Sequence, residues 1–242
     1  MNNTIPINST KEQQVEEMFN GIAHRYDFLN RVLSFGIDRR WRKKLVKGIL
    51  KGNPNHVLDI ATGTADLAIV LAEKNRNVKV TGVDIAENML SFGRTKVQKK
   101  RLANRIELIK ASALSLPFND KSFDAAMVAF GVRNFQEPVT GLTEINRVLR
   151  PGAQIFVLEF TNPRSKFFGK LYTFYFLKVL PTIGRLVSGH SEAYTYLPAS
   201  VKAFAEREAF TKMLNDSGFT NASYRELSFG IASLYQAVKP LS

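Results

Sequence analysis

The chain has 242 residues, 45% of them hydrophobic and 23% charged, which suits one packed domain and excludes a globally disordered protein. It contains no cysteine, which excludes disulfides, thiolate zinc sites and cysteine nucleophiles. A formal net charge of +13 favours anionic partners such as nucleic acid, acidic lipid or a phosphate-bearing ligand, with a solvated basic surface as the alternative.

Helical periodicity occupies the first part of the chain. Apolar residues recur at spacings of three and four over residues 15–26 and again over residues 41–49, and Gly36 separates the two runs. We therefore expect helices within residues 11–50, followed by a turn at residues 52–55. Residues 1–53 are interpreted as an N-terminal helical cap, and the polar start of the chain lacks the apolar centre of a signal peptide.

Short apolar strands and amphipathic helices alternate over residues 54–160, the expected cofactor-binding core. Strands are predicted at residues 56–60, 78–84, 105–110, 123–130 and 154–160. Helices are predicted at residues 65–74 and 86–100, and from Pro138 to the stop at Pro151 and Gly152. This alternation predicts an α/β fold in which a mostly parallel sheet carries helices on both faces.

The alternation stops after residue 160. Residues 161–200 are aromatic-rich and predict a helical lid inserted after strand five, whose longest apolar stretch, residues 171–180, is shorter than the roughly 20 residues of a membrane-spanning helix. Residues 201–242 predict a helix over 204–217, stopped by Gly218, and an edge hairpin of strands 222–229 and 231–238. Residues 1–242 are therefore expected to form a single domain.

The most informative segment follows the first strand. Asp59-Ile-Ala-Thr-Gly-Thr-Ala-Asp66 is a run of small residues between two acids, and Asp84 ends the second strand. In doubly wound folds an acid at that strand tip accepts hydrogen bonds from ribose hydroxyls. The glycine patterns that cradle pyrophosphate or phosphate are absent, which favours a nucleoside ligand without phosphates, such as S-adenosylmethionine.

Several segments resemble a known family. Residues 59–66, Asp84 and residues 111–118 (ASALSLPF) resemble the successive motifs of class I, Rossmann-like methyltransferases that use S-adenosylmethionine. Residues 26–41 (YDFLNRVLSFGIDRRW) and 147–161 (RVLRPGAQIFVLEFT) resemble the two signatures of the ubiquinone/menaquinone biosynthesis C-methyltransferases, the UbiE/MenG family. Residues 130–134 (FGVRN) also resemble that family, and the resemblance extends over residues 17–238.

The resemblance implies a reaction and its partners. The implied activity is methylation of a ring carbon of a polyprenylated hydroquinone, demethylmenaquinol to menaquinol, with the benzoquinol precursor of ubiquinone as the alternative substrate. The aromatic and cationic residues of 167–186 suit a prenyl tail and anionic lipid. We expect a cytoplasmic enzyme held peripherally at the inner face of the membrane, with no nucleic-acid partner; whether it forms a homo-oligomer stays open.

The resemblance also assigns cofactor-binding residues. Asp84 is expected at the ribose hydroxyls, with capping of the next helix as its alternative role. Gly63 and Thr64 are expected at the methionine part, and Ser112 and Ala113 at the adenine edge. Asp59, the remaining member of this set, is expected to organise the loop after the first strand.

Three residues are candidates for the chemistry. Arg133 and Asn134 follow the fourth strand, at the edge where ligands bind in such sheets. Arg133 can stabilise a developing phenolate or orient a water, and a surface salt bridge is the alternative. Tyr26 lies in the N-terminal helical segment, with core packing as the alternative.

Other functions are weighed against this one. The histidines show no metal-ligand spacing, so no metal is predicted, and only His190 is considered as a base. The positive charge makes an RNA methyltransferase the main enzyme alternative, although residues 129–134 lack the Asp/Asn-Pro-Pro-aromatic motif of amine-methylating nucleic-acid enzymes. A non-catalytic cofactor-binding scaffold at the membrane surface is the second alternative.

Overall fold

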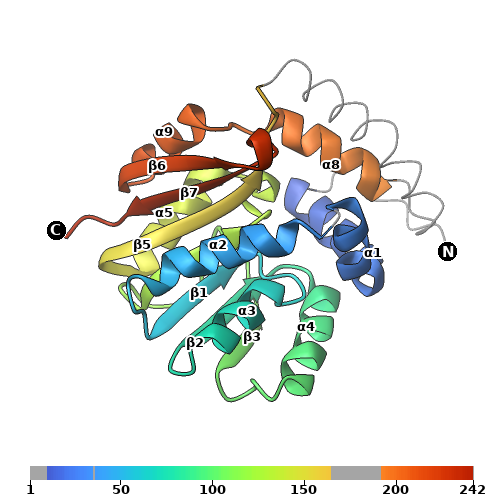
Figure 1. Ribbon diagram of the computed structural model, residues 1–242, viewed down its shortest axis with the longest axis horizontal. Helices are drawn as coiled ribbons and strands as arrows, with labels where there is room; N and C mark the ends of the chain where they lie inside the picture. Colours follow the sequence, from blue (N-terminus) through green and yellow to red (C-terminus); the bar gives the residue numbers. More distant parts are fainter. Residues whose placement is uncertain (1–9, 35, 165–191, 242) are drawn as a thin grey trace.

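The computed structural model describes residues 10–34, 36–164 and 192–241. In these residues seven strands form one sheet in the order β3-β2-β1-β4-β5-β7-β6 (Figure 1). The strands are β1 His56–Ile60, β2 Lys79–Asp84, β3 Ile106–Lys110, β4 Phe123–Ala129, β5 Leu149–Phe160, β6 Thr220–Leu227 and β7 Ala232–Val238. Strands β1 to β5 pair in parallel, whereas β7 is antiparallel to both β5 and β6. The predicted α/β fold and edge hairpin are confirmed.

Helices cover both faces of the sheet, as predicted. One buried cluster joins α2, α3 and α4 to the first face, and a second joins α5 and α9 to the other. The helices are α1 Lys11–Leu33, α2 Asp38–Leu50, α3 Asp66–Lys74, α4 Glu87–Lys99, α5 Pro138–Val148, α8 Glu192–Ala203 and α9 Glu208–Asp216, with short 3-10 turns at Val132–Asn134 (η1) and Ser228–Gly230 (η3). None of the described helices is long and apolar enough to cross a bilayer.

The two N-terminal helices take different positions. Helix α1 lies beside the ends of the strands, whereas α2 lies along the face of the sheet over β5 (Figure 1). Gly48 permits this close approach, because a Cβ atom there would lie 2.7 Å from the ring of Phe156. Trp41 packs from the buried side of α2 against Phe130 and Phe160, with both ring centroids 6.2 Å away.

The junction of α5 and β5 lies earlier than predicted. The helix ends at Val148 and not at Pro151, because the residue before a proline disfavours the helical conformation. Strand β5 therefore begins at Leu149, and its pairing with β4 contains a bulge at the segment where Gly152 has φ +78°. Glycine accepts that left-handed conformation without steric cost.

The C-terminal helix is shorter than predicted. It begins at Glu208, because Arg207 has φ +57° and donates its backbone N–H to the Tyr235 hydroxyl, 2.8 Å away, instead of continuing a helix. Helix α8 precedes it and crosses the boundary predicted between lid and C-terminal segment. The predicted lid falls mainly on residues 165–191, outside the described residues, and stays a prediction.

Candidate active site

The loop between β1 and α3 adopts the left-handed conformation repeatedly. Ala61 has φ 52°, Gly63 has φ 56° and Ala65 has φ 63°. This conformation costs a residue with a Cβ atom roughly 1–2 kcal/mol, and such strain gathers at functional sites. A Cβ at Gly63 would lie 3.4 Å from the Met89 Cε and 3.9 Å from the Tyr26 ring. The small residues of this loop therefore leave its backbone open to close contact.

Asp59 organises the loop from beneath. Its side chain is buried, and its Oδ2 accepts a hydrogen bond from the Thr62 hydroxyl at 2.7 Å. Burial raises the pKa of Asp59 to about 7, although the Thr62 hydrogen bond and the charge of Arg42 oppose that rise. Asp59 does not line the pocket described below.

Asp84 joins the loop to the start of α4. Its Oδ2 accepts the backbone N–H of Gly63 at 2.8 Å, and its Oδ1 accepts the N–H of Ala86 at 2.9 Å. Burial raises the pKa of Asp84, and these N–H donors oppose the rise. The alternative capping role is thus partly realised, three residues before the start of α4, but Asp84 also lines the pocket.

Thr64 faces an ion-pair network behind the loop. Its hydroxyl donates to Asp27 on α1 at 2.5 Å, and Lys96 on α4 donates to Asp27 at 2.7 Å and to Thr64 at 3.0 Å. Lys96 also pairs with Asp66, to which Arg42 on α2 donates at 2.9 Å. Burial alone would raise the pKa of Asp66, but Lys96 and Arg42 lower it. The network fixes α1 and α2 to the core.

A pocket lies at the carboxyl ends of β1, β2 and β4, under α1. The strand order reverses between β1 and β4, which is where open α/β sheets bind ligands. No lysine or arginine of the described residues lines it. Its polar side chains are Glu12, Tyr26, Asp84, Ser112, Asn134 and Gln136.

The structure divides the predicted residues into two groups. Those that line the pocket are Tyr26, Gly63, Asp84, Ser112, Ala113 and Asn134. Asp59, Thr64 and Arg133 do not line it. The second group therefore supports the walls of the pocket.

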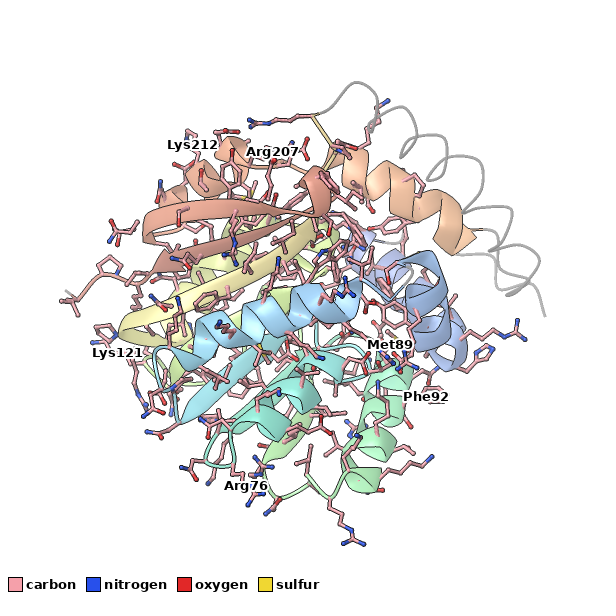
Figure 2. The ribbon with its side chains drawn as sticks, in the orientation of Figure 1. Arg76, Met89, Phe92, Lys121, Arg207 and Lys212 are labelled. Atoms are coloured by element: carbon pink, nitrogen blue, oxygen red, sulfur yellow. The ribbon has the colours of Figure 1, made fainter. Side chains whose placement is uncertain are left out.

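Helix α1 closes the pocket. Val15, Phe19 and Tyr26 line it, and Phe19 meets Tyr26 edge to face at 5.8 Å. Met89 packs against this cluster from the start of α4 (Figure 2). The remaining volume is about 70 Å³, whereas small-molecule pockets typically have roughly 300–1,000 Å³. The pocket in this structure is therefore smaller than a nucleoside requires.

Polar contacts hold the N-terminal end of α1 in this closed position. Glu12 accepts a hydrogen bond from the Ser112 hydroxyl, which in turn accepts the N–H of Leu114 at 3.1 Å. Lys11 Nζ donates to the carbonyl oxygens of Arg133 and Phe135, at 3.1 and 2.7 Å. Sequence reasoning missed both α1 residues, because nothing local in the chain shows which loop a helix start will meet.

Arg133 forms a buried ion pair, so the surface salt bridge considered for it is wrong. Its NH1 lies 2.9 Å from Glu159 Oε2, with 6% and 0% of the two side chains exposed. Its Nε donates to the Ser200 hydroxyl on α8 at 3.3 Å, and its guanidinium carbon lies 5.7 Å from the centre of the Phe160 ring. Glu159 was missed, although an acid inside an apolar strand signals a buried partner.

Asn134 connects the pocket to α8. Its Oδ1 accepts a hydrogen bond from the Tyr196 hydroxyl at 3.1 Å. Burial raises the pKa of Tyr196, so this phenol stays protonated and a donor at neutral pH. Tyr196 was not predicted, because it lies in the aromatic-rich segment where no residue pattern distinguishes one aromatic from another.

Comparisons with known proteins agree with this geometry. A sequence model of the ubiE/COQ5 methyltransferase family matches residues 7–239. The chain is similar to the ubiquinone/menaquinone biosynthesis C-methyltransferase UbiE of Geobacter sulfurreducens, with 45% identity over 232 residues, covering 96% of this chain and 90% of the relative. It is also similar to the demethylmenaquinone methyltransferase of Deinococcus radiodurans, with 49% identity over 225 residues, covering 93% and 92%.

Solved structures show the same fold. The cyclase SpnF matches with a TM-score of 0.71 and 17% identity, covering 98% of this chain and 99% of that one. A SAM dependent methyltransferase from Aquifex aeolicus matches with a TM-score of 0.59 and 20% identity, covering 81% and 88%. At sequence identities this low, the matches show a shared fold and nothing about function.

Proposed function

We propose that this chain, which belongs to the ubiE/COQ5 methyltransferase family, transfers a methyl group from S-adenosylmethionine to a ring carbon of demethylmenaquinol in menaquinone biosynthesis. One observation carries the proposal. In a chain of net charge +13, the pocket at the strand-order reversal is lined by two acids, Glu12 and Asp84, and by no lysine or arginine of the described residues. Such a pocket favours a cationic ligand over a phosphate-bearing one.

The residues present fit this cofactor. S-adenosylmethionine carries a sulfonium and an ammonium group, and when bound it supplies an electrophilic methyl group. Asp84 keeps lone pairs beyond the two used by Gly63 and Ala86, and these would accept the ribose hydroxyls. Gly63 lets the backbone approach the methionine part, and Ser112 and Ala113 border the position proposed for adenine.

The chain's role in the chemistry is to position the quinol. The ring carbon becomes more nucleophilic when a neighbouring hydroxyl loses its proton, so that hydroxyl must be oriented and its anion favoured. Tyr26 and Asn134 line the pocket and are proposed to contact the substrate. Arg133 stands behind Asn134 in η1, held by Glu159, and is proposed as a positioning residue.

Binding and turnover test the proposal separately. We expect calorimetry to show S-adenosylhomocysteine binding that weakens about 10-fold or more in Asp84→Asn, since hydrogen bonds to a charged group contribute about 1.5–3 kcal/mol. Asp216→Asn, on the exposed side of α9, is the matched control and should bind like the parent. Equal binding by parent and Asp84→Asn would contradict the assignment.

A methyl-transfer assay then identifies the acceptor. Parent protein with labelled S-adenosylmethionine should methylate a short-chain demethylmenaquinol analogue, and the benzoquinol analogue and total RNA are the parallel acceptors. Label in RNA and none in quinol would favour the RNA methyltransferase. Cofactor binding without any turnover would favour the scaffold.

Peripheral attachment to the inner face of the membrane is part of the proposal. A polyprenylated substrate resides in the bilayer, and a basic protein surface is attracted to anionic lipid. Flotation with liposomes tests the attachment. Analytical ultracentrifugation of the same preparation determines whether the chain is a monomer or a homo-oligomer.

A further inference from the structure

Helix α2 carries a row of cations on its outer side. Its buried side consists of Trp41, Leu45 and Ile49, with Val46 and Arg42 next to them. The opposite side, here called the α2 cationic face, consists of exposed residues at helical spacings of three and four: Arg40, Lys43, Lys44, Lys47 and Lys51. The helix rises about 1.5 Å per residue, so these charges, with Lys51 directly after the helix, form one line about 16 Å long.

The folded chain does not use these charges. In the described residues, no ion pair and no side-chain hydrogen bond involves any member of the α2 cationic face. By contrast, Lys100, Lys110 and Lys212 elsewhere on the surface each pair with a carboxylate. Like charges three and four positions apart repel one another along a helix. These positive charges therefore do not stabilise the fold, and an anionic partner explains their presence better.

A groove runs beside this face. It has a volume of about 790 Å³ and lies between α2 and strands β5, β7 and β6. Lys44, Lys47 and Lys51 line it from α2, and the exposed Arg225 lines it from β6. The one acid among its lining residues, Asp124, already pairs with Arg150 and accepts the backbone N–H groups of residues 55 and 56. The groove is therefore cationic.

The N-terminal end of α2 lies close to the pocket. Trp41, on the buried side of α2, packs against Phe130, which is one of the residues that line the pocket. Phe130 stacks on Phe160 at 4.5 Å and has φ 60°, so its position is fixed by packing and not by its backbone preference. Only the first turns of α2, which carry Arg40 and Lys43, approach the pocket in this way. The groove lies at the opposite ends of the strands, beside Pro54, Asp124 and Gly152.

We infer that the α2 cationic face and its groove dock the protein on a surface of anionic phospholipid, with headgroup phosphates entering the groove. The inference rests on the proposed function, because a bilayer-resident quinol must be reached from the membrane. Each cation near an anionic leaflet strengthens binding by roughly fivefold. Lipid is favoured over RNA because the proposed acceptor is a polyprenylated quinol, which resides in the bilayer and not on RNA.

The test reverses charge on the face and on a matched control. Lys43→Glu/Lys47→Glu/Lys51→Glu changes three α2 cations, and Lys74→Glu/Lys79→Glu/Lys99→Glu changes three exposed lysines of α3, β2 and α4 by the same net charge. Thermal melts establish that both variants of the full chain fold. Binding is measured by co-sedimentation with vesicles of 30% phosphatidylglycerol in phosphatidylcholine and with phosphatidylcholine alone.

We expect the partition coefficient onto anionic vesicles to fall more than 100-fold in the α2 variant and less than 10-fold in the control variant, relative to the parent. Neither variant should bind neutral vesicles. Equal losses in the two variants would show an effect of net charge alone and overturn the inference. Vesicle binding that is unchanged in the α2 variant would also overturn it.

Two further measurements separate the remaining outcomes. If the parent binds RNA but not vesicles, and the α2 variant loses the RNA binding, the partner of this face is RNA and not lipid. Methylation of the short-chain quinol analogue should be unchanged in the α2 variant, since no α2 cation lines the pocket. If the parent binds anionic vesicles through α2 but methylates no quinol, the proposed function fails and the docking surface stands.

Discussion

Removing the Glu159 carboxylate should destabilise the fold far more than removing an exposed carboxylate. Glu159 accepts hydrogen bonds from the Arg133 guanidinium at 2.9 Å and from the backbone N–H groups of Arg133 and Phe160, both at 3.3 Å. Glu159→Ala leaves a guanidinium that is 6% exposed without its counter-charge. Breaking a buried ion pair in this way typically costs about 3–5 kcal/mol, so we expect the free energy of unfolding to fall by that amount.

Urea denaturation at pH 7.5 measures the loss. The control is Asp216→Ala, which removes the partner of Lys212 at 2.6 Å on the outside of α9, where the two side chains are 50% and 75% exposed (Figure 2). That pair should contribute no more than about 1 kcal/mol. A loss of about 1 kcal/mol or less in Glu159→Ala would refute the reasoning, because it would mean that water or another group compensates Arg133 in place of Glu159.

Three further predictions concern other parts of the chain. Gly21→Ala should raise the free energy of unfolding by about 1 kcal/mol, since a Cβ there meets nothing within 4 Å. Gly48→Ala should lower it by about 1–2 kcal/mol, because a Cβ there would lie 2.7 Å from Phe156. Calorimetry measures both melting temperatures, and an upward shift in both variants would contradict the prediction. The pKa of Asp59 is raised from 3.8 to about 7, so its contribution to stability is present at pH 4 and is lost as the pH rises through 7. Asp59→Asn should remove this pH dependence. If the urea midpoints of parent and variant differ by the same amount at pH 5 and at pH 8, the prediction is wrong. Ser112→Ala removes the hydrogen bond to Glu12 and should accelerate amide hydrogen exchange in the first turn of α1. Equal exchange in parent and variant would show that this hydrogen bond does not hold the N-terminal end of the helix.

The fold was predictable because its elements are encoded locally. Alternating strands and helices over residues 54–160 require a parallel sheet with two helical layers, and the structure has both. Where the observed helix boundaries differ from the predicted ones, a single residue explains each difference. Pro151 ended α5 earlier than the apolar pattern indicated, and the left-handed backbone of Arg207, tied to Tyr235, delayed the start of the last helix from residue 204 to residue 208.

The site was predictable only where it follows the strand tips. Asp84, Gly63 and Ser112 come directly after strands, and parallel strands bring their carboxyl ends to one edge, where these residues line one pocket. Glu12 and Tyr196 come from helices whose docking depends on contacts 100 and 62 positions away in the chain. Thr64 was expected at the ligand, but Asp27 and Lys96, both distant in sequence, hold its hydroxyl behind the loop.

The position of α1 has a consequence for synthesis of the protein. Lys11 on α1 donates to the carbonyl oxygen of Phe135, which is translated 124 residues later. At roughly 5–20 residues per second, the intervening segment takes on the order of 6–25 seconds to translate. For that time the apolar stripe of α1, which includes Val15 and Ile22, has no finished surface to cover it. Until residue 135 has been translated, α1 therefore cannot take its native place over the pocket.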